Sequence, residues 1–180
     1  MSGRYFFAID LEDNARARVS SVAGSLKGID GARWVKPENY HLTLLFLGDR
    51  AADDLAKLCH HARAIAAETS PFTLDLQGVG FFPDQRRPRV LYMDVCRGRE
   101  AVIRLAGALH MADGQQAAKF RPHLTLARLR TAGPVRISAH TQPIAVTVRE
   151  FILFSSTLTP SGPIYRPVQT FSLAGVVTGE

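Results

Sequence analysis

The chain has 180 residues, enough for one domain with a substantial hydrophobic core; 46% of its residues are hydrophobic and 21% are charged. This composition excludes a disordered protein, and the apolar runs are too short to span a bilayer. The formal net charge of +6 and the pI of about 9.8 favour an anionic partner, of which nucleic acid is the commonest class.

The N-terminal half is predicted to alternate strands with amphipathic helices. Residues 4–10 have the apolar character of a strand, and residues 14–27 carry apolar side chains at helical spacing. The next predicted strand begins at His41 and closes at Gly48. Residues 51–68 then predict a second helix with one apolar face.

The second half continues this alternation. A strand is predicted over 71–79 and a basic, Gly/Pro-punctuated loop over 80–88. A strand over 89–95 and a helix over 100–111 precede another strand that begins at His123. Towards the C-terminus the pattern predicts strands over 146–155 and 169–177, separated by a turn-rich segment over 157–165.

The order of strand, helix and His-Leu-Thr-Leu strand occurs twice, first near Tyr5 and again near Leu91. This is an internal duplication of structure rather than a short repeat of the solenoid type. It favours an α+β or α/β protein with two similar lobes. No segment has the composition of a linker, so we predict a single compact domain over residues 1–180.

The repeated tetrapeptide covers residues 41–44 and 123–126. Alternate residues of a strand point to the same side, so His41 and Thr43 share one face while leucines occupy the other. The same alternation places His123 and Thr125 together. If the two lobes face each other, we expect these four side chains to converge on one cleft.

Two imidazoles across a cleft suit phosphoester chemistry that needs no metal. A neutral histidine takes a proton from the nucleophile and a protonated one gives a proton to the leaving oxygen, since the ordinary histidine pKa of about 6.5 lies near neutral pH. Threonine hydroxyls can donate to phosphate oxygens. Arg128 could add a bidentate clamp, although its strand parity is opposite to that of His123 and a bulge, a twist or a strand end is needed to turn it inward.

Other uses of these residues are weaker. One His-Leu-Thr-Leu alone indicates only a buried strand, but two copies after similar units favour a paired site. Zinc needs three or four ligands, and threonine, a poor ligand, holds the position two residues after each histidine, so we predict no metal and no cofactor. Cys59 and Cys96 lack metal-ligand spacing and are expected to be free thiols. Aromatic residues predicted on loops, any of which could stack on a base, are Phe81, Phe82 and Tyr165.

The chain closely resembles the RNA 2′,3′-cyclic phosphodiesterases of the two-histidine phosphoesterase superfamily, historically called 2′-5′ RNA ligases. The resemblance implies an α+β fold in which two pseudo-twofold-related lobes of antiparallel sheet, with flanking helices, enclose a central cleft. It runs almost end to end and rests on the segments RYFFAI, RWVKPENYHLTLLFLG, GFFP…PRVLY, FRPHLTLAR and LFSSTLTPSGPIYRPV.

The resemblance also implies a reaction, the hydrolysis of an RNA terminal 2′,3′-cyclic phosphate to a 2′-phosphomonoester. By position in the motifs, His41 would be the proton donor to O3′ and His123 the proton acceptor from water. Thr43, Thr125 and Arg128 would hold the phosphate and the substrate. The residues alone leave open which histidine is acid and which is base, because the two motifs are nearly symmetric.

Two other functions fit the same residues. The acid–base pair could join RNA ends in 2′-5′ ligation, with a ribose 5′-hydroxyl in place of water, or the cleft could serve a non-catalytic nucleotide- or RNA-binding module. The expected partner is RNA or a nucleotide with a 2′,3′-cyclic phosphate end. The N-terminus lacks the long apolar stretch of a signal peptide, so we expect a cytoplasmic protein without a membrane segment, acting as a monomer.

Overall fold

The computed structural model describes residues 3–115, 120–130, 133–135, 137 and 141–175. Over these residues the chain forms two antiparallel sheets and three α-helices, so the expectation of an α+β fold is confirmed. The elements in chain order are β1 (Gly3–Asp10), α1 (Asp13–Ser25), β2 (Ala32–Trp34), the 3-10 helix η1 (Pro37–Asn39), β3 (His41–Arg50), α2 (Ala52–Glu68), β4 (Phe72–Phe82), β5 (Val90–Arg97), α3 (Arg99–Ala112), β6 (His123–Leu129), β7 (Ile144–Val148), β8 (Glu150–Thr159) and β9 (Gly162–Ser172).

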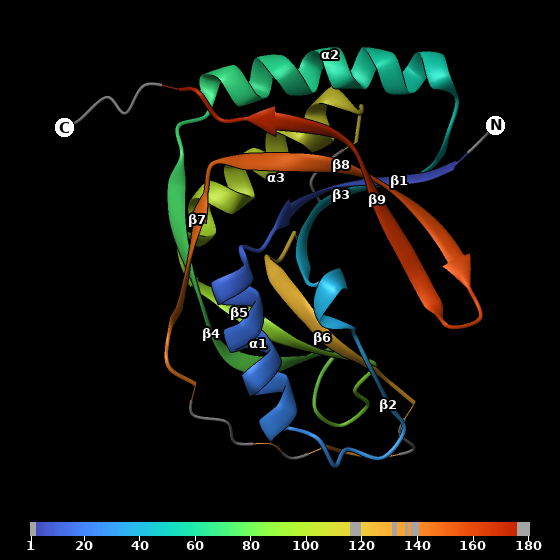
Figure 1. Ribbon diagram of the computed structural model, residues 1–180, viewed down its shortest axis with the longest axis vertical. Coiled ribbons are helices and arrows are strands. Elements are labelled where there is room, and N and C mark those ends of the chain that lie inside the picture. Colours follow the sequence, from blue (N-terminus) through green and yellow to red (C-terminus); the bar gives the residue numbers. More distant parts are fainter. Residues whose placement is uncertain (1–2, 116–119, 131–132, 136, 138–140, 176–180) are drawn as a thin grey trace.

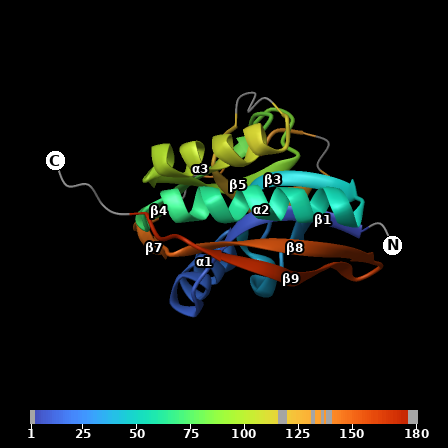
Figure 2. The same cartoon turned by 90° about the horizontal axis from the view of Figure 1, so that it is seen from above.

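The two sheets meet along the strands that carry the repeated tetrapeptide. One sheet has the order β3-β1-β8-β9 and the other the order β2-β6-β5-β4-β7, and β3 contacts β6 across their junction. α3 packs against β3 and α2, while α1 packs against β7 and η1 (Figures 1 and 2). The units β1–α1–β3 and β5–α3–β6 therefore repeat one arrangement, as the duplication in the sequence predicts.

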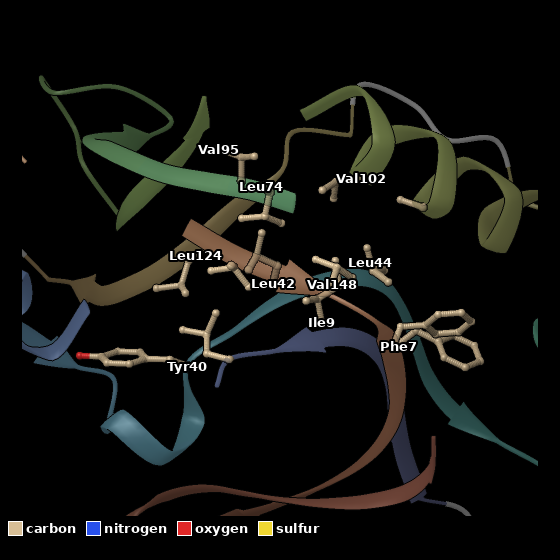
Figure 3. Close-up of a cluster of buried hydrophobic side chains, with 14 of the residues drawn as sticks. Phe7, Ile9, Tyr40, Leu42, Leu44, Leu74, Val95, Val102, Leu124 and Val148 are labelled. Carbon is tan, nitrogen blue, oxygen red and sulfur yellow. The ribbon is translucent and has the colours of Figure 1, made fainter. Parts of the chain in front are cut away.

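Leucines of both tetrapeptides build the core between the sheets. Leu42, Leu44, Leu124 and Leu126 are fully buried in one hydrophobic cluster that includes residues of both sheets (Figure 3). Burying each such side chain contributes about 1.5–3 kcal/mol. Because these leucines face the core, the alternate residues of β3 and β6, which include the motif histidines and threonines, face the other side of each strand. The extent of the domain, residues 1–180, stays a prediction.

The predicted helices over 14–27, 51–68 and 100–111 are confirmed to within two residues at each end. Both cysteines are free, Cys59 being buried in α2 and Cys96 exposed in β5. In the described part of the chain, none of the helices combines the length and apolar character needed to cross a membrane.

Four predictions about strands are wrong. The strand over 169–177 ends at Ser172 as the last part of β9, and residues 176–177 lie outside the described residues. The single strand over 146–155 is two strands, which separate at Arg149 and join different sheets. The turn-rich segment over 157–165 is mostly a β-hairpin, because β8 runs to Thr159 and β9 starts at Gly162. The first residues of the loop over 80–88 belong to β4. The hairpin was missed because it lacks a buried face near its turn, so no alternation marks it.

Candidate active site

A β-bulge in β3 changes which side chains face the cleft. The pairing with β1 skips one residue between Thr43 and Leu45, so that Leu44 and Leu45 are both buried. After this bulge Phe46 returns to the side that His41 and Thr43 occupy. The exposed fraction of Phe46 is 66%, which is high for a large apolar residue and leaves its ring available to a ligand.

An equivalent bulge in β6 turns Arg128 toward the cleft. The pairing with β5 skips one residue between Thr125 and Ala127, so that Leu126 and Ala127 are both buried. Of the bulge, twist or strand end that could turn Arg128 inward, the structure has the bulge. Arg128 occupies in β6 the place that Phe46 occupies in β3, five residues after the motif histidine.

All five predicted site residues line one cavity. Its volume is ≈ 610 Å³, and His41, Thr43, His123, Thr125 and Arg128 all contribute to its wall. Both histidines are half-buried rather than sealed in the core. Tyr165, which the sequence analysis named as a possible stacking residue, also lines this cavity. The sequence analysis did not identify the other main wall residues, which are Arg33, Trp34, Lys36, Phe46 and Leu158.

A second cavity of ≈ 380 Å³ adjoins the first. Thr43, Phe46 and His123 line both cavities, and Phe82 and Arg121 line only the second. His41 lines only the first. The second cavity therefore reaches the site from the side of His123.

Each imidazole is held by the carbonyl group two residues before it. The Nδ1 atom of His41 lies 2.8 Å from the Asn39 carbonyl oxygen, and that of His123 lies 2.7 Å from the Arg121 carbonyl oxygen. A carbonyl oxygen can only accept, so Nδ1 carries the hydrogen in both rings and Nε2 is left for proton transfer. The Nε2 atom of His41 lies 3.0 Å from the Thr43 hydroxyl oxygen.

Aromatic rings pack against both histidines and limit their rotation. Phe82 and Tyr165, predicted on loops, lie instead in β4 and β9 and contact the histidines, while Phe81 is buried. The ring-centroid distances are 5.0 Å from His41 to Phe6, 5.2 Å from His41 to Tyr165, 4.9 Å from His123 to Phe82 and 5.5 Å from His123 to Tyr92.

Burial lowers the pKa of both histidines below the ordinary value, and the backbone hydrogen bond of each ring opposes this effect. After these two effects, the next largest influence on each pKa is a nearby charge, and its sign differs between the two histidines. The largest charge effect on His41 is that of Asp10, which favours the protonated ring. The largest on His123 is that of the Arg121 guanidinium group, which favours the neutral ring. Opposing charges act on both rings: His123 and Arg16 lower the pKa of His41, and Asp94 raises the pKa of His123.

Metal ligation is the alternative use of such histidines. A zinc site needs three or four ligands of the His, Cys, Asp or Glu type. Within the ranges that the structure describes, no group of three or more of these side chains lies close enough together to hold a metal ion. Independence from metal ions itself stays a prediction.

Comparison with known proteins adds to this geometry. The model of the LigT-like phosphoesterases matches residues 9–92 and 97–165. The chain belongs to the LigT-like phosphoesterase family. An RNA 2′,3′-cyclic phosphodiesterase of Archaeoglobus fulgidus is 34% identical over 93% of this chain and 99% of the relative.

Solved structures of LigT-like phosphoesterases have the same fold. A crystal structure from Thermus thermophilus superposes with a TM-score of 0.86 at 31% identity and covers 96% of this chain and 98% of the other. Escherichia coli LigT in complex with NADP+ gives a TM-score of 0.85 at 28% identity, over 97% of this chain and 99% of the other. The expected bilobal two-histidine phosphoesterase fold is thereby confirmed.

Proposed function

We propose that this LigT-like phosphoesterase hydrolyses the terminal 2′,3′-cyclic phosphate of RNA to a 2′-phosphomonoester, with His41 as general acid and His123 as general base. One observation carries the proposal: both imidazoles line one cavity together with two threonine hydroxyls and an arginine. The name of the Archaeoglobus fulgidus relative supports the substrate. The division of roles follows the position of each histidine in its motif, as the family resemblance implies.

The reaction requires one bond to form and one to break at phosphorus. Neutral His123 takes a proton from water through Nε2 as the water oxygen bonds to phosphorus. Protonated His41 gives its Nε2 proton to O3′ as the bond between phosphorus and O3′ breaks. The phosphate remains on O2′. After the step His123 is protonated and His41 is neutral, and proton exchange with the solvent restores the starting state of both rings.

The negative charge of the phosphate oxygens is stabilised by donors from both motif strands. The hydroxyl groups of Thr43 and Thr125 donate to non-bridging oxygens, and the Arg128 guanidinium group adds a charge-assisted contact. These donors are in place before substrate binds, so they need little reorganisation as charge develops. The five residues come from one chain, so the site needs no second subunit, which supports a monomer. The free thiols of Cys59 and Cys96 support a reducing compartment such as the cytoplasm.

We expect hydrolysis to continue in excess EDTA, because proton transfer by two imidazoles does not require a metal ion. The measurement is the reaction of an RNA that ends in a 2′,3′-cyclic phosphate, with and without EDTA, and identification of the product phosphate on O2′ or O3′. A 2′-phosphate formed at the same rate in both samples supports the proposal. Activity that is lost in EDTA and restored by zinc, or a 3′-phosphate product, would contradict it.

The side chain of Phe46 is expected to stack on the terminal base of the RNA. Its ring is exposed and lines both cavities beside the histidines. Since stacking on an aromatic side chain contributes about 1–3 kcal/mol per base, Phe46→Ala should raise KM by roughly 10-fold or more, with little change in kcat. Phe46→Tyr is the control that keeps a ring. Equal KM values for the wild type and Phe46→Ala would remove Phe46 from the binding site.

The second cavity favours 2′-5′ ligation as a second candidate function. This cavity is lined by His123 but not by His41. Its volume of ≈ 380 Å³ greatly exceeds the volume that one water molecule occupies, about 30 Å³. An RNA 5′-hydroxyl could therefore approach the proposed base from that side. Adding RNA with a 5′-hydroxyl to the hydrolysis assay separates the two functions: a 2′-5′-joined product indicates ligation, and its absence at high RNA concentration leaves hydrolysis alone.

A further inference from the structure

Arg16 of α1 has an unusually complete set of hydrogen bonds for a residue that does not line the cleft. Its Nη1 atom donates to the carbonyl oxygens of Pro37 at 2.8 Å and Tyr40 at 3.5 Å. Its Nη2 atom donates to the Asp10 carboxylate at 2.8 Å and the Leu11 carbonyl oxygen at 2.7 Å. The guanidinium group thus joins the end of β1 to the segment that precedes β3.

The segment held by Arg16 contains the group that orients His41. Pro37 and Tyr40 flank Asn39, and the Asn39 carbonyl oxygen accepts the Nδ1 hydrogen of His41. The Tyr40 amide donates to the Pro37 carbonyl oxygen at 3.1 Å, which closes this turn. Arg16 therefore holds both sides of the turn whose middle carbonyl fixes the imidazole.

The other half of the molecule repeats this arrangement with different residues. Asp94 is the cross-strand partner of His123, as Asp10 is of His41. Asp94 accepts from Arg99 at 2.6 Å and lies 3.6 Å from Arg121, whose carbonyl oxygen holds His123. In both halves the aspartate opposite a motif histidine thus forms an ion pair with an arginine. The pair with Arg121 is looser, since that side chain is half-exposed and its ion pair is long.

We propose that Arg16 is a positioning residue for His41: it holds the turn that carries the Asn39 carbonyl and so fixes the Nδ1–H tautomer and the orientation of the ring. Asp10 holds the guanidinium group in place. Arg16 acts through the backbone and does not touch the substrate. The catalytic consequence rests on the proposed function, in which His41 gives a proton through Nε2, whereas the tautomer does not depend on it.

A purely structural role for Arg16 makes a different prediction. In that case Arg16 only ties α1 to η1, and its loss lowers the melting temperature without changing the imidazole. The two roles are therefore separated by a measurement on the His41 ring itself. Arg18 of the same helix is a matched control, because it also donates to a proline carbonyl, that of Pro143 at 2.8 Å, and lines neither cavity.

The experiment compares the wild type with Arg16→Met, Arg16→Lys and Arg18→Met in imidazole ¹⁵N spectra, with the His41 signals assigned by their loss in His41→Gln. We expect the Nδ1–H tautomer of His41 in the wild type and in Arg18→Met, and a mixture of tautomers in both Arg16 variants. Because a misplacement of about 1 Å can cost about 10²-fold, Arg16→Met should lower kcat by about that factor with little change in KM. Arg18→Met should leave kcat unchanged.

A folded Arg16 variant that keeps the pure Nδ1–H tautomer and the wild-type kcat would overturn the proposal. If Arg16→Met does not fold, Arg16→Lys decides the matter, because lysine keeps the charge but a single ammonium group cannot replace the planar fork of donors. A wild-type protein inactive on cyclic phosphates would refute the proposed function, while the tautomer comparison would still test the role of Arg16.

Discussion

Replacement of His41 or His123 by alanine should lower kcat/KM for a 2′,3′-cyclic phosphate by at least about 10²-fold, the usual contribution of a positioned acid or base. Each ring is held by a backbone carbonyl and lines the shared cavity. Each motif strand contributes one histidine to the wall of that cavity, so a neighbouring imidazole on the same strand cannot take over the lost role. The measurement is steady-state hydrolysis by each variant, with His60→Ala, an exposed change on α2, as the control. Wild-type turnover in either single variant would refute the proposed roles.

The pH dependence separates the two roles. In the wild type kcat/KM should rise with pH as His123 loses its proton and fall as His41 loses its proton, giving a bell. Since burial lowers the pKa of both rings, the rising limb should lie below the ordinary histidine pKa of about 6.5. The residual activity of His123→Ala should lack the rising limb and that of His41→Ala the falling limb. The opposite pattern would exchange the acid and the base.

Replacement of Arg128 by methionine is expected to lower kcat/KM by about 10²-fold, as is typical when one donor to a developing oxyanion is removed. Methionine keeps much of the length of the side chain but removes the charge and the planar set of donors. Arg128→Lys should recover only part of the loss, because an ammonium group cannot make the bidentate contact.

The control for Arg128 is Arg130→Met, an exposed arginine two residues along the chain that lines neither cavity. It lowers the net charge by the same amount, so it corrects for the general attraction between a basic protein and RNA. If Arg128→Met and Arg130→Met lose the same small amount of activity, Arg128 acts only through the overall charge. That result would contradict its proposed contact with the phosphate.

Much of the fold follows from local patterns. Helical spacing of apolar residues predicted α1, α2 and α3 because each helix buries one face against a sheet. The β7–β8 break was missed because it depends on which sheet each strand joins. The strand-like pattern over 146–155 carries no information about that choice. The β8–β9 hairpin was missed because no buried face marks the residues near its turn.

Within the candidate site, the sequence was sufficient to predict that each motif histidine shares a strand face with its threonine, because a repeated i, i+2 pattern opposite buried leucines follows directly from the geometry of a strand. Whether Arg128 and Phe46 join them was decided by the fold. Each stands beyond a bulge, and a bulge depends on the register of a partner strand that is distant in the sequence. The same holds for Arg16, whose acceptors belong to two separate segments that only the folded chain brings together.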